Sequence, residues 1–289
     1  MLTFRAEKEV GRKKLQNTFL QARLACNSPH NFYWPWQEDS EPDESLVLAS
    51  GKMQLLDRLV TCLLGKGHKI LIFSQFKTQL DIISDWASLL RSWRCCRIDG
   101  AIAQADRQAQ IEEFNNNADY KIFLLSTRAG GQGINLTAAD TVILYDSDWN
   151  PQQDLQAQDR AHRIGQTKPV IVYRLITKDT VEETLLETAD NKRRLERLVI
   201  EKGKFRTPMV SNNTQQAEER KASSTDVLER FEKSANPGLL LSDEDLEILT
   251  DRSEEAYERA EKGLDQSGPA FVAVETKRGG LVDESITLL

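Results

Sequence analysis

The stretch LLSTRAGGQGIN, residues 124–135, decides the fold of this chain. It continues an apolar run that begins at Ile122 and stops at Ser126 in a polar, glycine-rich turn. A buried strand that ends at glycines leaves backbone N–H groups open to an anion. The sequence therefore predicts a strand over 121–125 followed by an anion-binding turn.

A second strand and a helix follow this turn. Residues 141–145 are apolar, and the polar segment DSDWNP ends at Pro151, which suits the first turn of a helix. That helix is expected to carry Gln156, Arg160 and Arg163. The two arginines are three residues apart and so lie on one helical face, where guanidinium groups suit the oxygens of a polyphosphate.

The alternative for these arginines is a surface helix on which they pair with nearby carboxylates. Asp154 and Asp159 are in reach on the same segment. For an isolated Arg-x-x-Arg pair this is the commoner situation. Here the pair follows a glycine-rich turn, which favours the phosphate interpretation.

Strands and helices alternate through the middle of the chain, and the strands are almost continuously apolar. This pattern is typical of an α/β fold, a parallel sheet with helices on both faces. Ligands bind beyond the carboxyl ends of such strands. The expected strands are 70–73, 95–98, 121–125, 141–145 and 170–176, and the polar residues at their ends are Ser74, Gln75, Asp99, Gly100, Ser126, Thr127, Arg128 and Asp146.

Gly51-Lys52 is not a phosphate loop. The motif needs a glycine five residues before Gly51, where the chain has Leu46, and a serine or threonine at Met53. The two residues instead open an amphipathic helix whose apolar face is formed by Leu55, Leu56, Leu59 and Leu63.

Composition excludes several classes of protein. The chain has 289 residues, 39% of them hydrophobic and 29% charged, which is normal for a protein with a packed core. A net charge of -7 argues against a protein that coats nucleic acid with its whole surface. No apolar run reaches the length of a membrane span, the chain begins without a secretory signal, and the spacing of its four cysteines and three histidines predicts no metal site.

Several of these motifs resemble one family. Residues 126–135 resemble motif V, and residues 156–163 motif VI, of the superfamily-two helicases. The segments DSDWNP (146–151) and HRIGQ (162–166) are similar to those of the Swi/Snf-type ATPases that remodel chromatin. Residues 135–141 and 166–170 are most similar to the lymphoid-specific-helicase branch, although Gln132 stands where that pattern has a leucine.

The resemblance implies a RecA-like sheet of the P-loop NTPase type, which forms the second of two ATPase lobes, with a helical and disordered C-terminal extension. The segment Cys26-Asn27-Ser28-Pro29 resembles the end of a first lobe. The expected organisation is a first-lobe tail (1–36), a linker (37–49), the RecA-like lobe (50–178), a basic brace helix (179–206), a disordered linker (207–236), short acidic helices with Ser242 as an N-cap (237–264) and a mobile tail (265–289) that holds a short strand near 271–274.

The resemblance also implies roles for individual residues. Arg160 and Arg163 would act as arginine fingers on ATP, with Gln156 positioning them, and Gly133 and Asn135 would line the nucleotide side. The residues expected to contact double-stranded DNA are Ser74, Gln75, Ser126, Thr127, Arg128, Trp149 and Asn150. Mg²⁺ and most of ATP would be bound by the first lobe, in cis or in trans, and the remodelled substrate would be a nucleosome in the nucleus.

No phosphate loop and no Asp-Glu pair after an apolar strand occur in the sequence. The isolated chain is therefore expected to hydrolyse little or no ATP. Three interpretations remain: a fragment of a full remodeller, a non-catalytic module that binds DNA or a partner, and a lobe completed by another polypeptide. A strand-separating DNA-repair helicase is the alternative chemistry.

Overall fold

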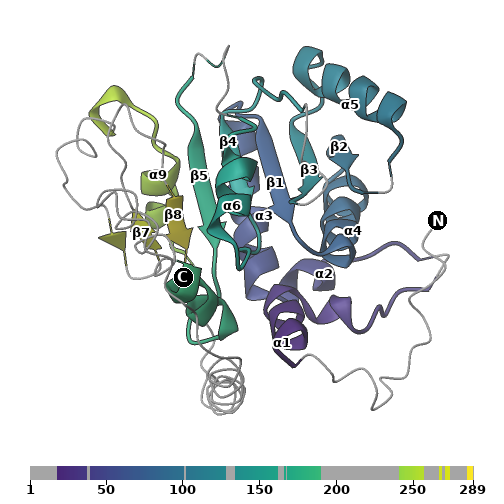
Figure 1. Cartoon of the computed structure of the whole chain (residues 1–289), viewed down its shortest axis with the longest axis vertical. Coiled ribbons are helices and arrows are strands. Elements are labelled where there is room, and N and C mark those ends of the chain that lie inside the picture. Colours follow the sequence, from purple (N-terminus) through teal and green to yellow (C-terminus); the bar gives the residue numbers. More distant parts are fainter. Residues whose placement is uncertain are drawn as a thin grey trace, which may run out of the picture.

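The structure is a computed structural model whose centre is one sheet with the strand order β2-β3-β1-β4-β5-β8-β7-β6 (Figure 1). It describes residues 18–37, 40–100, 102–127, 134–161, 166, 168–189, 241–256, 267–268, 271–273 and 285–288. The strands are β1 (Ile70–Ser74), β2 (Cys95–Ile98), β3 (Ile122–Ser126), β4 (Thr141–Leu144), β5 (Ile171–Leu175), β6 (Ser267–Gly268), β7 (Phe271–Ala273) and β8 (Ser285–Leu288).

The first five strands are parallel, as the alternation of strands and helices predicts. Ile70 of β1 pairs with Ile122 of β3 and with Thr141 of β4, so the three central strands are in register. Their carboxyl ends therefore meet at one edge of the sheet. The arrangement is the RecA-like α/β fold expected from the sequence.

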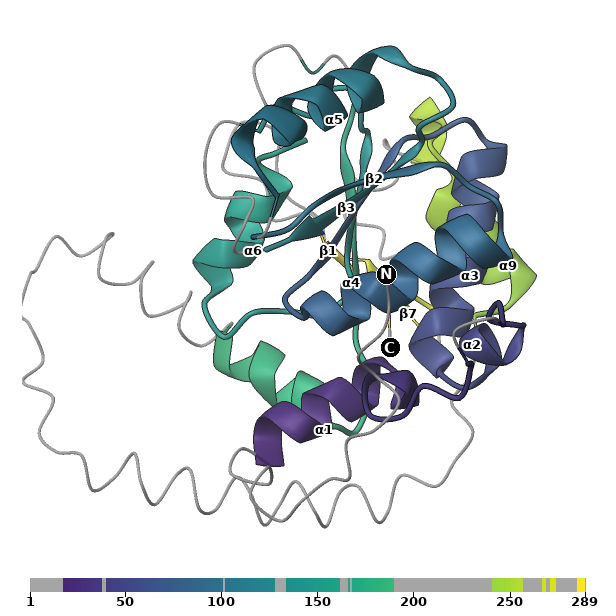
Figure 2. The same cartoon turned by 90° about the vertical axis from the view of Figure 1, so that its right-hand side faces the viewer.

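Both faces of the sheet are covered, which explains why its central strands are almost continuously apolar. Ile70 and Ile72 belong to a core shared with α2, α3, α4 and α9, whereas Leu71 and Phe73 belong to a second core shared with α5 and α6. Figure 2 shows α5 and α6 on one side of the sheet and α3 and α9 on the other.

Helix α3 (Gly51–Gly65) opens at Gly51 as the sequence predicts, whereas α2 (Ser45–Leu48) lies within 37–49, the expected linker, with Leu46 and Val47 buried. Helix α3 begins after Ser50, whose Oγ accepts the N–H of Met53, and its chain leaves through Gly67 at a φ of 85°. The bounds are α1 (Thr18–Asn27), a 3₁₀ turn (Pro29–Asn31), α2 (Ser45–Leu48), α3 (Gly51–Gly65), α4 (Lys77–Asp85) with a π-helical continuation (Trp86–Leu90), α5 (Gln104–Asn116), α6 (Pro151–Gln158) and α9 (Asp243–Thr250), with further helical residues at 181–189 and 254–256.

Helix α6 is shorter than the sequence indicates. It ends at Gln158, and Arg160 lies in the following turn, where its N–H donates to the carbonyl of Ala157 at 3.3 Å. The bond spans three residues instead of four and so tightens the end of the helix. Arg163 lies outside the described residues.

The C-terminal segment folds back on the sheet. Ser242 and Asp245 form the capping box that starts α9, as the sequence predicts for Ser242. Strand β8 pairs in parallel with β5, and β7 and β6 continue the sheet with antiparallel pairing. These three strands lie within 265–289, where the sequence indicated a mobile tail with one short strand.

Other expected segments fall partly outside the described residues. The structure describes helix over 181–189 of the expected brace helix and over 254–256 of the second acidic helix, and it describes nothing of 207–236. Cys26, Cys62, Cys95 and Cys96 are free thiols. Within the described ranges, no helix is long and apolar enough to cross a membrane.

Candidate functional site

The carboxyl edge of the sheet gathers most of the residues predicted to contact DNA. Ser74 and Gln75 follow β1, Ser126 and Thr127 end β3, and the segment 146–150 follows β4. The backbone N–H of Thr127 donates to the carbonyl of Ser74 at 3.2 Å, so the ends of β1 and β3 stay paired past their last residues. Arg128 and Gly133 lie outside the described residues.

Asp146 is the centre of this edge. Its carboxylate accepts the Ser74 hydroxyl, the Gln75 N–H at 2.8 Å and the Asn27 side-chain amide at 3.0 Å. The side chain is fully buried, and burial raises its pKa above the usual range for aspartate, although these donors oppose the shift. Ser74 is therefore committed to Asp146 and not exposed at the edge.

Among the described residues of this edge, three side-chain atoms are buried without a hydrogen-bond partner: Gln75 Nε2, Thr127 Oγ1 and Ser147 Oγ. Buried polar side-chain atoms normally find partners, so unpartnered ones call for an explanation, and an external acceptor is one such explanation. Gln75 and Thr127 follow neighbouring strands, β1 and β3.

The segment 146–150 is built to start α6. Asp148 accepts the N–H of Asn150 at 2.8 Å, and the Asn150 side chain accepts the N–H of Gln152 at 3.1 Å. Asn150 is thus the N-cap of the helix. Trp149 is 39% exposed and packs against Phe19 of α1, with the rings tilted by 38° and their centroids 4.7 Å apart.

The residues predicted to touch nucleotide lie away from this edge. Helix α6 (Pro151–Gln158) leads away from the edge by about 12 Å of helical rise, and Arg160 lies in the turn beyond its end. Gln156 is exposed on α6, Asn135 is exposed with its carbonyl accepting the Asn115 amide at 3.0 Å, and Arg160 is only 6% exposed. The predicted residues therefore form two groups.

Asp154 pairs with a residue that the sequence interpretation did not include. Its carboxylate lies 3.6 Å from the guanidinium of Arg174 on β5, and both side chains are 4% exposed. Asp154 also accepts the N–H of Asp148 at 3.2 Å. Burial raises the pKa of Asp154 to about 6, against the opposing charge of Arg174. The pair joins α6 to the sheet.

Gln166 is a second residue that the motif comparison left without a role. Its side-chain amide donates to the carbonyls of Ala139 at 2.6 Å and Thr137 at 3.1 Å. It therefore fixes the segment that leads from the glycine-rich turn into β4. A glutamine after a glycine is the only signal in the sequence, and it does not indicate this contact.

Four buried charged or polar groups below the edge were also missed. Lys52 donates to Asn27 Oδ1 at 3.1 Å and to the carbonyl of Tyr145 at 3.0 Å, and it forms an ion pair with Glu182. Arg23 of α1 donates to the carbonyl of Ser147 at 2.7 Å. The one available signal was Lys52, which falls on the apolar face of α3.

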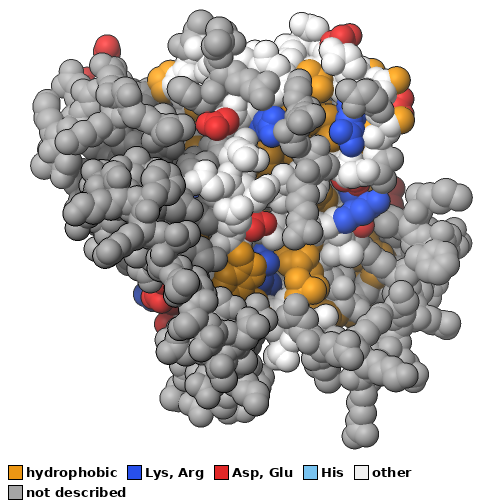
Figure 3. All heavy atoms as spheres, viewed as in Figure 1, with side chains coloured by type: hydrophobic (Ala, Val, Ile, Leu, Met, Phe, Trp, Pro, Cys, Tyr) orange, Lys and Arg blue, Asp and Glu red, His pale blue; other side chains and the backbone are white. Residues whose placement is uncertain are grey.

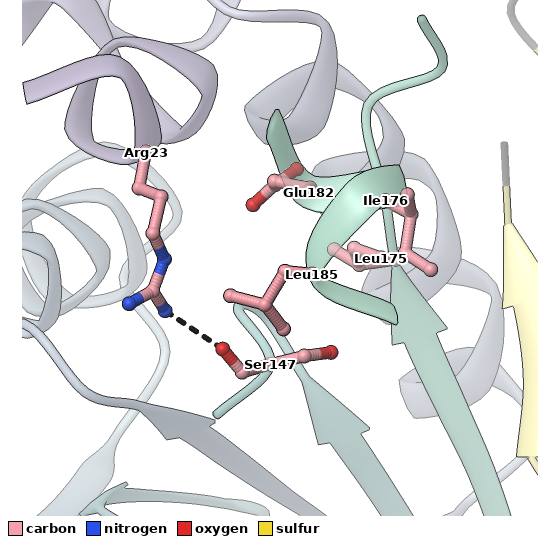
Figure 4. Close-up of a pocket in the computed structure, with 6 residues that line it drawn as sticks. All are labelled: Arg23, Ser147, Leu175, Ile176, Glu182 and Leu185. Carbon is pink, nitrogen blue, oxygen red and sulfur yellow. Dashed lines mark hydrogen bonds between the residues drawn. The ribbon is translucent and has the colours of Figure 1, made fainter. Parts of the chain in front are cut away.

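Figure 4 shows how Arg23 reaches from α1 toward the segment after β4, while Glu182 and Leu185 approach from the helix over 181–189. The crevice between them has no room for a water-sized molecule, so these groups meet as a packed junction and not as a ligand pocket. On the face seen in Figure 3, the described Lys and Arg side chains stand apart from one another.

Comparisons with known proteins agree with this geometry. The helicase conserved C-terminal domain matches residues 51–165, which begin at α3 and end beyond α6. Human lymphoid-specific helicase is 45% identical over 249 residues, covering 83% of this chain and 30% of its own length. The ATP-dependent DNA helicase DDM1 of Arabidopsis thaliana is 41% identical over 288 residues, covering 93% and 36%.

A third relative and a solved structure complete the comparison. The ISWI chromatin-remodeling complex ATPase ISW2 of Saccharomyces cerevisiae is 49% identical over 203 residues, covering 68% of this chain and 18% of its own length. The crystal structure of the C-terminal part of the Fun30 ATPase domain is 40% identical, covers 59% of this chain and 53% of its own, and superposes with a TM-score of 0.48. The chain spans about a third or less of the curated relatives' length.

Proposed function

Because the chain carries a helicase conserved C-terminal domain of the Snf2 chromatin-remodeller type, we propose that it is the second lobe of an ATP-dependent DNA translocase that acts on nucleosomes in the nucleus. Its contribution is twofold. The carboxyl edge of the sheet contacts one strand of duplex DNA, and the turn after α6 presents an arginine to ATP held by a first lobe.

The observation that carries the DNA half is the pair of unpartnered donors at the ends of β1 and β3. Gln75 Nε2 and Thr127 Oγ1 are buried, yet neither has an acceptor. Phosphate oxygens of a DNA backbone supply acceptors at such an edge, and contacts of this kind position a protein without reading sequence. We assign the contact with the second strand to Trp149, which is 39% exposed in the segment after β4.

The nucleotide half rests on α6 and the turn that follows it. Gln156, Asn135 and Arg160 are the described residues that fit ATP, since the first two expose amides and the third carries a guanidinium. ATP when bound supplies the phosphoryl group whose transfer to water drives translocation. Because Arg160 is 6% exposed, closure of the lobes must turn its side chain outward before it reaches a phosphate.

Magnesium has no site among these residues. Over the ranges that the structure describes, no group of three or more His, Cys, Asp or Glu side chains is placed to hold a metal ion. We propose that the first lobe holds Mg²⁺.

The DNA half is tested by the affinity of the chain for a fluorescently labelled duplex, measured by anisotropy at several salt concentrations. Thr127→Val removes the hydroxyl with little change in shape and is expected to weaken binding on the order of fivefold, equally for all sequences. Thr177→Val is the matched control, because Thr177 Oγ1 is also buried and unpartnered but lies after β5. Equal effects of the two variants would contradict the assignment.

The nucleotide half is tested in a protein that contains both lobes. Arg160→Ala is expected to lower DNA-stimulated ATP hydrolysis by several orders of magnitude, and Arg160→Lys to restore little, because a point charge does not replace the planar fork. Unchanged hydrolysis by Arg160→Ala would remove Arg160 from the mechanism.

A further inference from the structure

Asn27 joins the segment before the linker to the carboxyl edge of the sheet. Its side chain is fully buried at the end of α1, 119 residues from Asp146, to whose carboxylate it donates at 3.0 Å. Its backbone carbonyl accepts the hydroxyls of Ser50 and Tyr145, each at 2.8 Å. One residue therefore contacts the start of α3 and the end of β4.

The chemistry of the position requires an amide. Asn27 Nδ2 donates to the Asp146 carboxylate while Asn27 Oδ1 accepts from the Lys52 ammonium at 3.1 Å. A side-chain amide is neutral and offers a donor and an acceptor on separate atoms of a short side chain, which matches both partners. An aspartate here would face Asp146 with like charge in a buried site, where such repulsion is strong.

Asp146 connects Asn27 to the edge that is proposed to contact DNA. The same carboxylate accepts the Gln75 N–H at 2.8 Å and the Ser74 hydroxyl, and the backbone continues from Asp146 into Trp149 and Asn150. The orientation of the Gln75 backbone and the start of the 147–150 segment are therefore set by an anion whose own placement depends on Asn27.

The rest of α1 touches the same two places. Arg23 donates to the carbonyl of Ser147 at 2.7 Å, as Figure 4 shows, and its guanidinium lies 5.1 Å from the centre of the Phe76 ring. Phe19 packs against Trp149, with ring centroids 4.7 Å apart. Helix α1 thus lies against both parts of the chain that are proposed to contact DNA.

We propose that Asn27 is a positioning residue: through Asp146 it fixes Gln75 and the 147–150 segment against α1, so that a displacement of the segment before the linker moves the DNA-contacting edge. This inference rests on the proposed function for its consequence in DNA binding. The dependence of Gln75 and the 147–150 segment on Asn27 can be measured without DNA or ATP, and it is tested first.

The first test is amide hydrogen exchange of the whole chain, which needs no ligand. In Asn27→Asp, the amides of Gln75, Asn150 and Gln152 are expected to exchange on the order of tenfold faster than in the wild type, because local opening becomes easier. Asn31→Ala is the matched control. Asn31 lies in the same segment and donates to Gln79 at 2.8 Å.

Asn31→Ala is expected to loosen the segment without reaching the edge. If it accelerates the three amides as much as Asn27→Asp does, or if Asn27→Asp leaves them unchanged, the proposal is overturned. The contrast separates a positioning role from general docking of residues 18–36.

A second test restores the pair in reverse. In Asn27→Asp with Asp146→Asn, the amide at position 146 donates to the carboxylate at 27, which also pairs with Lys52, and the new carbonyl accepts the Gln75 N–H. Exchange at Gln75 is expected to return to within about threefold of the wild type. If Asn27→Asp alone fails to fold, recovery of the native fold by the double variant supports the proposal, and failure to recover overturns it.

Duplex DNA affinity then tests the consequence. Asn27→Asp is expected to weaken binding on the order of tenfold, the double variant to recover most of it, and Asn31→Ala to stay within about twofold. If the wild-type chain does not bind duplex DNA at low salt, the proposed function fails while the exchange result still decides the role of Asn27. If the wild type binds and Asn27→Asp binds equally well, the inference fails and the proposed function stands.

Discussion

Lys52 and Glu182 form a buried ion pair that joins the start of α3 to the helix over 181–189, with side chains 4% and 7% exposed. Lys52 directs two further hydrogen bonds to Asn27 and Tyr145, and Glu182 accepts the N–H of Thr177 at 2.9 Å. A buried pair is tolerated only when its remaining hydrogen-bonding capacity is met in this way. The pair therefore joins the first helix of the lobe, α3, to the helix that follows its strand β5.

Removing one member of this pair is expected to be costly. Lys52→Met leaves Glu182 buried without its cation and should lower the free energy of unfolding by about 3–5 kcal/mol, whereas Lys52→Met with Glu182→Leu should recover most of the loss. Urea denaturation measures both. Arg94→Met is the control, since Arg94 pairs with Asp119 at the surface, and it should cost less than about 1 kcal/mol. A small effect of Lys52→Met alone would mean that Glu182 is not held as an anion.

The sheet was predictable from the sequence because its signal is local. Runs such as 70–73 and 122–125 are apolar at every position, and this occurs where a strand is covered on both faces. The same argument found the face of α3 from Leu55 and Leu59. It did not find the role of Lys52 on that face, because the partner is 130 residues away and periodicity carries no information on such a distance.

The candidate site was predicted as a set of positions but not as a set of contacts. The carboxyl-edge rule placed Ser74, Gln75, Thr127 and Asp146 together, as the structure has them. It did not reveal that the Ser74 hydroxyl turns inward to Asp146. The direction in which a hydroxyl donates depends on which acceptor lies next to it. Asp146 comes to lie next to Ser74 only when β4 pairs with β1.

Asn150 illustrates how a structural role and a proposed DNA contact are separated. Its side chain accepts the Gln152 N–H at 3.1 Å and so caps α6. Asn150→Ala should lower the free energy of unfolding by about 1 kcal/mol, and Asn150→Asp should retain the cap. Thermal or urea denaturation measures this part.

The DNA contact of Asn150 gives the opposite pattern for the same two variants. Asn150→Asp keeps the fold but brings a negative charge near DNA phosphates, so its affinity for duplex should fall on the order of tenfold at low salt. If Asn150→Asp binds duplex as tightly as the wild type, Asn150 is a cap and does not contact DNA.

Helix α9 is held to the lobe by a small number of buried contacts. The hydroxyl of Tyr173 on β5 donates to the carbonyl of Leu249 at 2.8 Å, and Lys66 of α3 donates to the Thr250 carbonyl at 3.1 Å. Tyr173→Phe leaves the Leu249 carbonyl without its donor and should cost about 1–2 kcal/mol.

The distribution of this loss identifies its origin. Hydrogen exchange of the α9 amides in Tyr173→Phe should accelerate more than exchange in β1 or β3, since the lost bond is local to the docked helix. Ser242→Ala, which breaks the capping box of α9, should accelerate the same amides. Uniform acceleration throughout the lobe in both variants would show that α9 belongs to the cooperative core.

Asp154 makes the stability of the lobe depend on pH in a direction unusual for a carboxylate. Burial raises its pKa from 3.8 to about 6 despite the Arg174 guanidinium at 3.6 Å. The folded protein thus holds the proton more tightly than the unfolded chain. The resulting stabilisation is complete below pH 3.8 and is lost as the pH rises through 6.

Asp154→Asn removes this titration and keeps an acceptor for the Asp148 N–H. The free energy of unfolding of the wild type, measured relative to this variant by urea denaturation, should fall on the order of 1 kcal/mol between about pH 5 and 7.5, because the folded protein gives up its proton in that interval. The absolute stability of Asp154→Asn also contains the cost of leaving Arg174 without its anion, and this cost is the same at both pH values because arginine does not titrate there. The pH dependence of the difference therefore isolates Asp154. Parallel curves for the two proteins would show that Arg174 keeps Asp154 ionised throughout and that the ion pair outweighs burial.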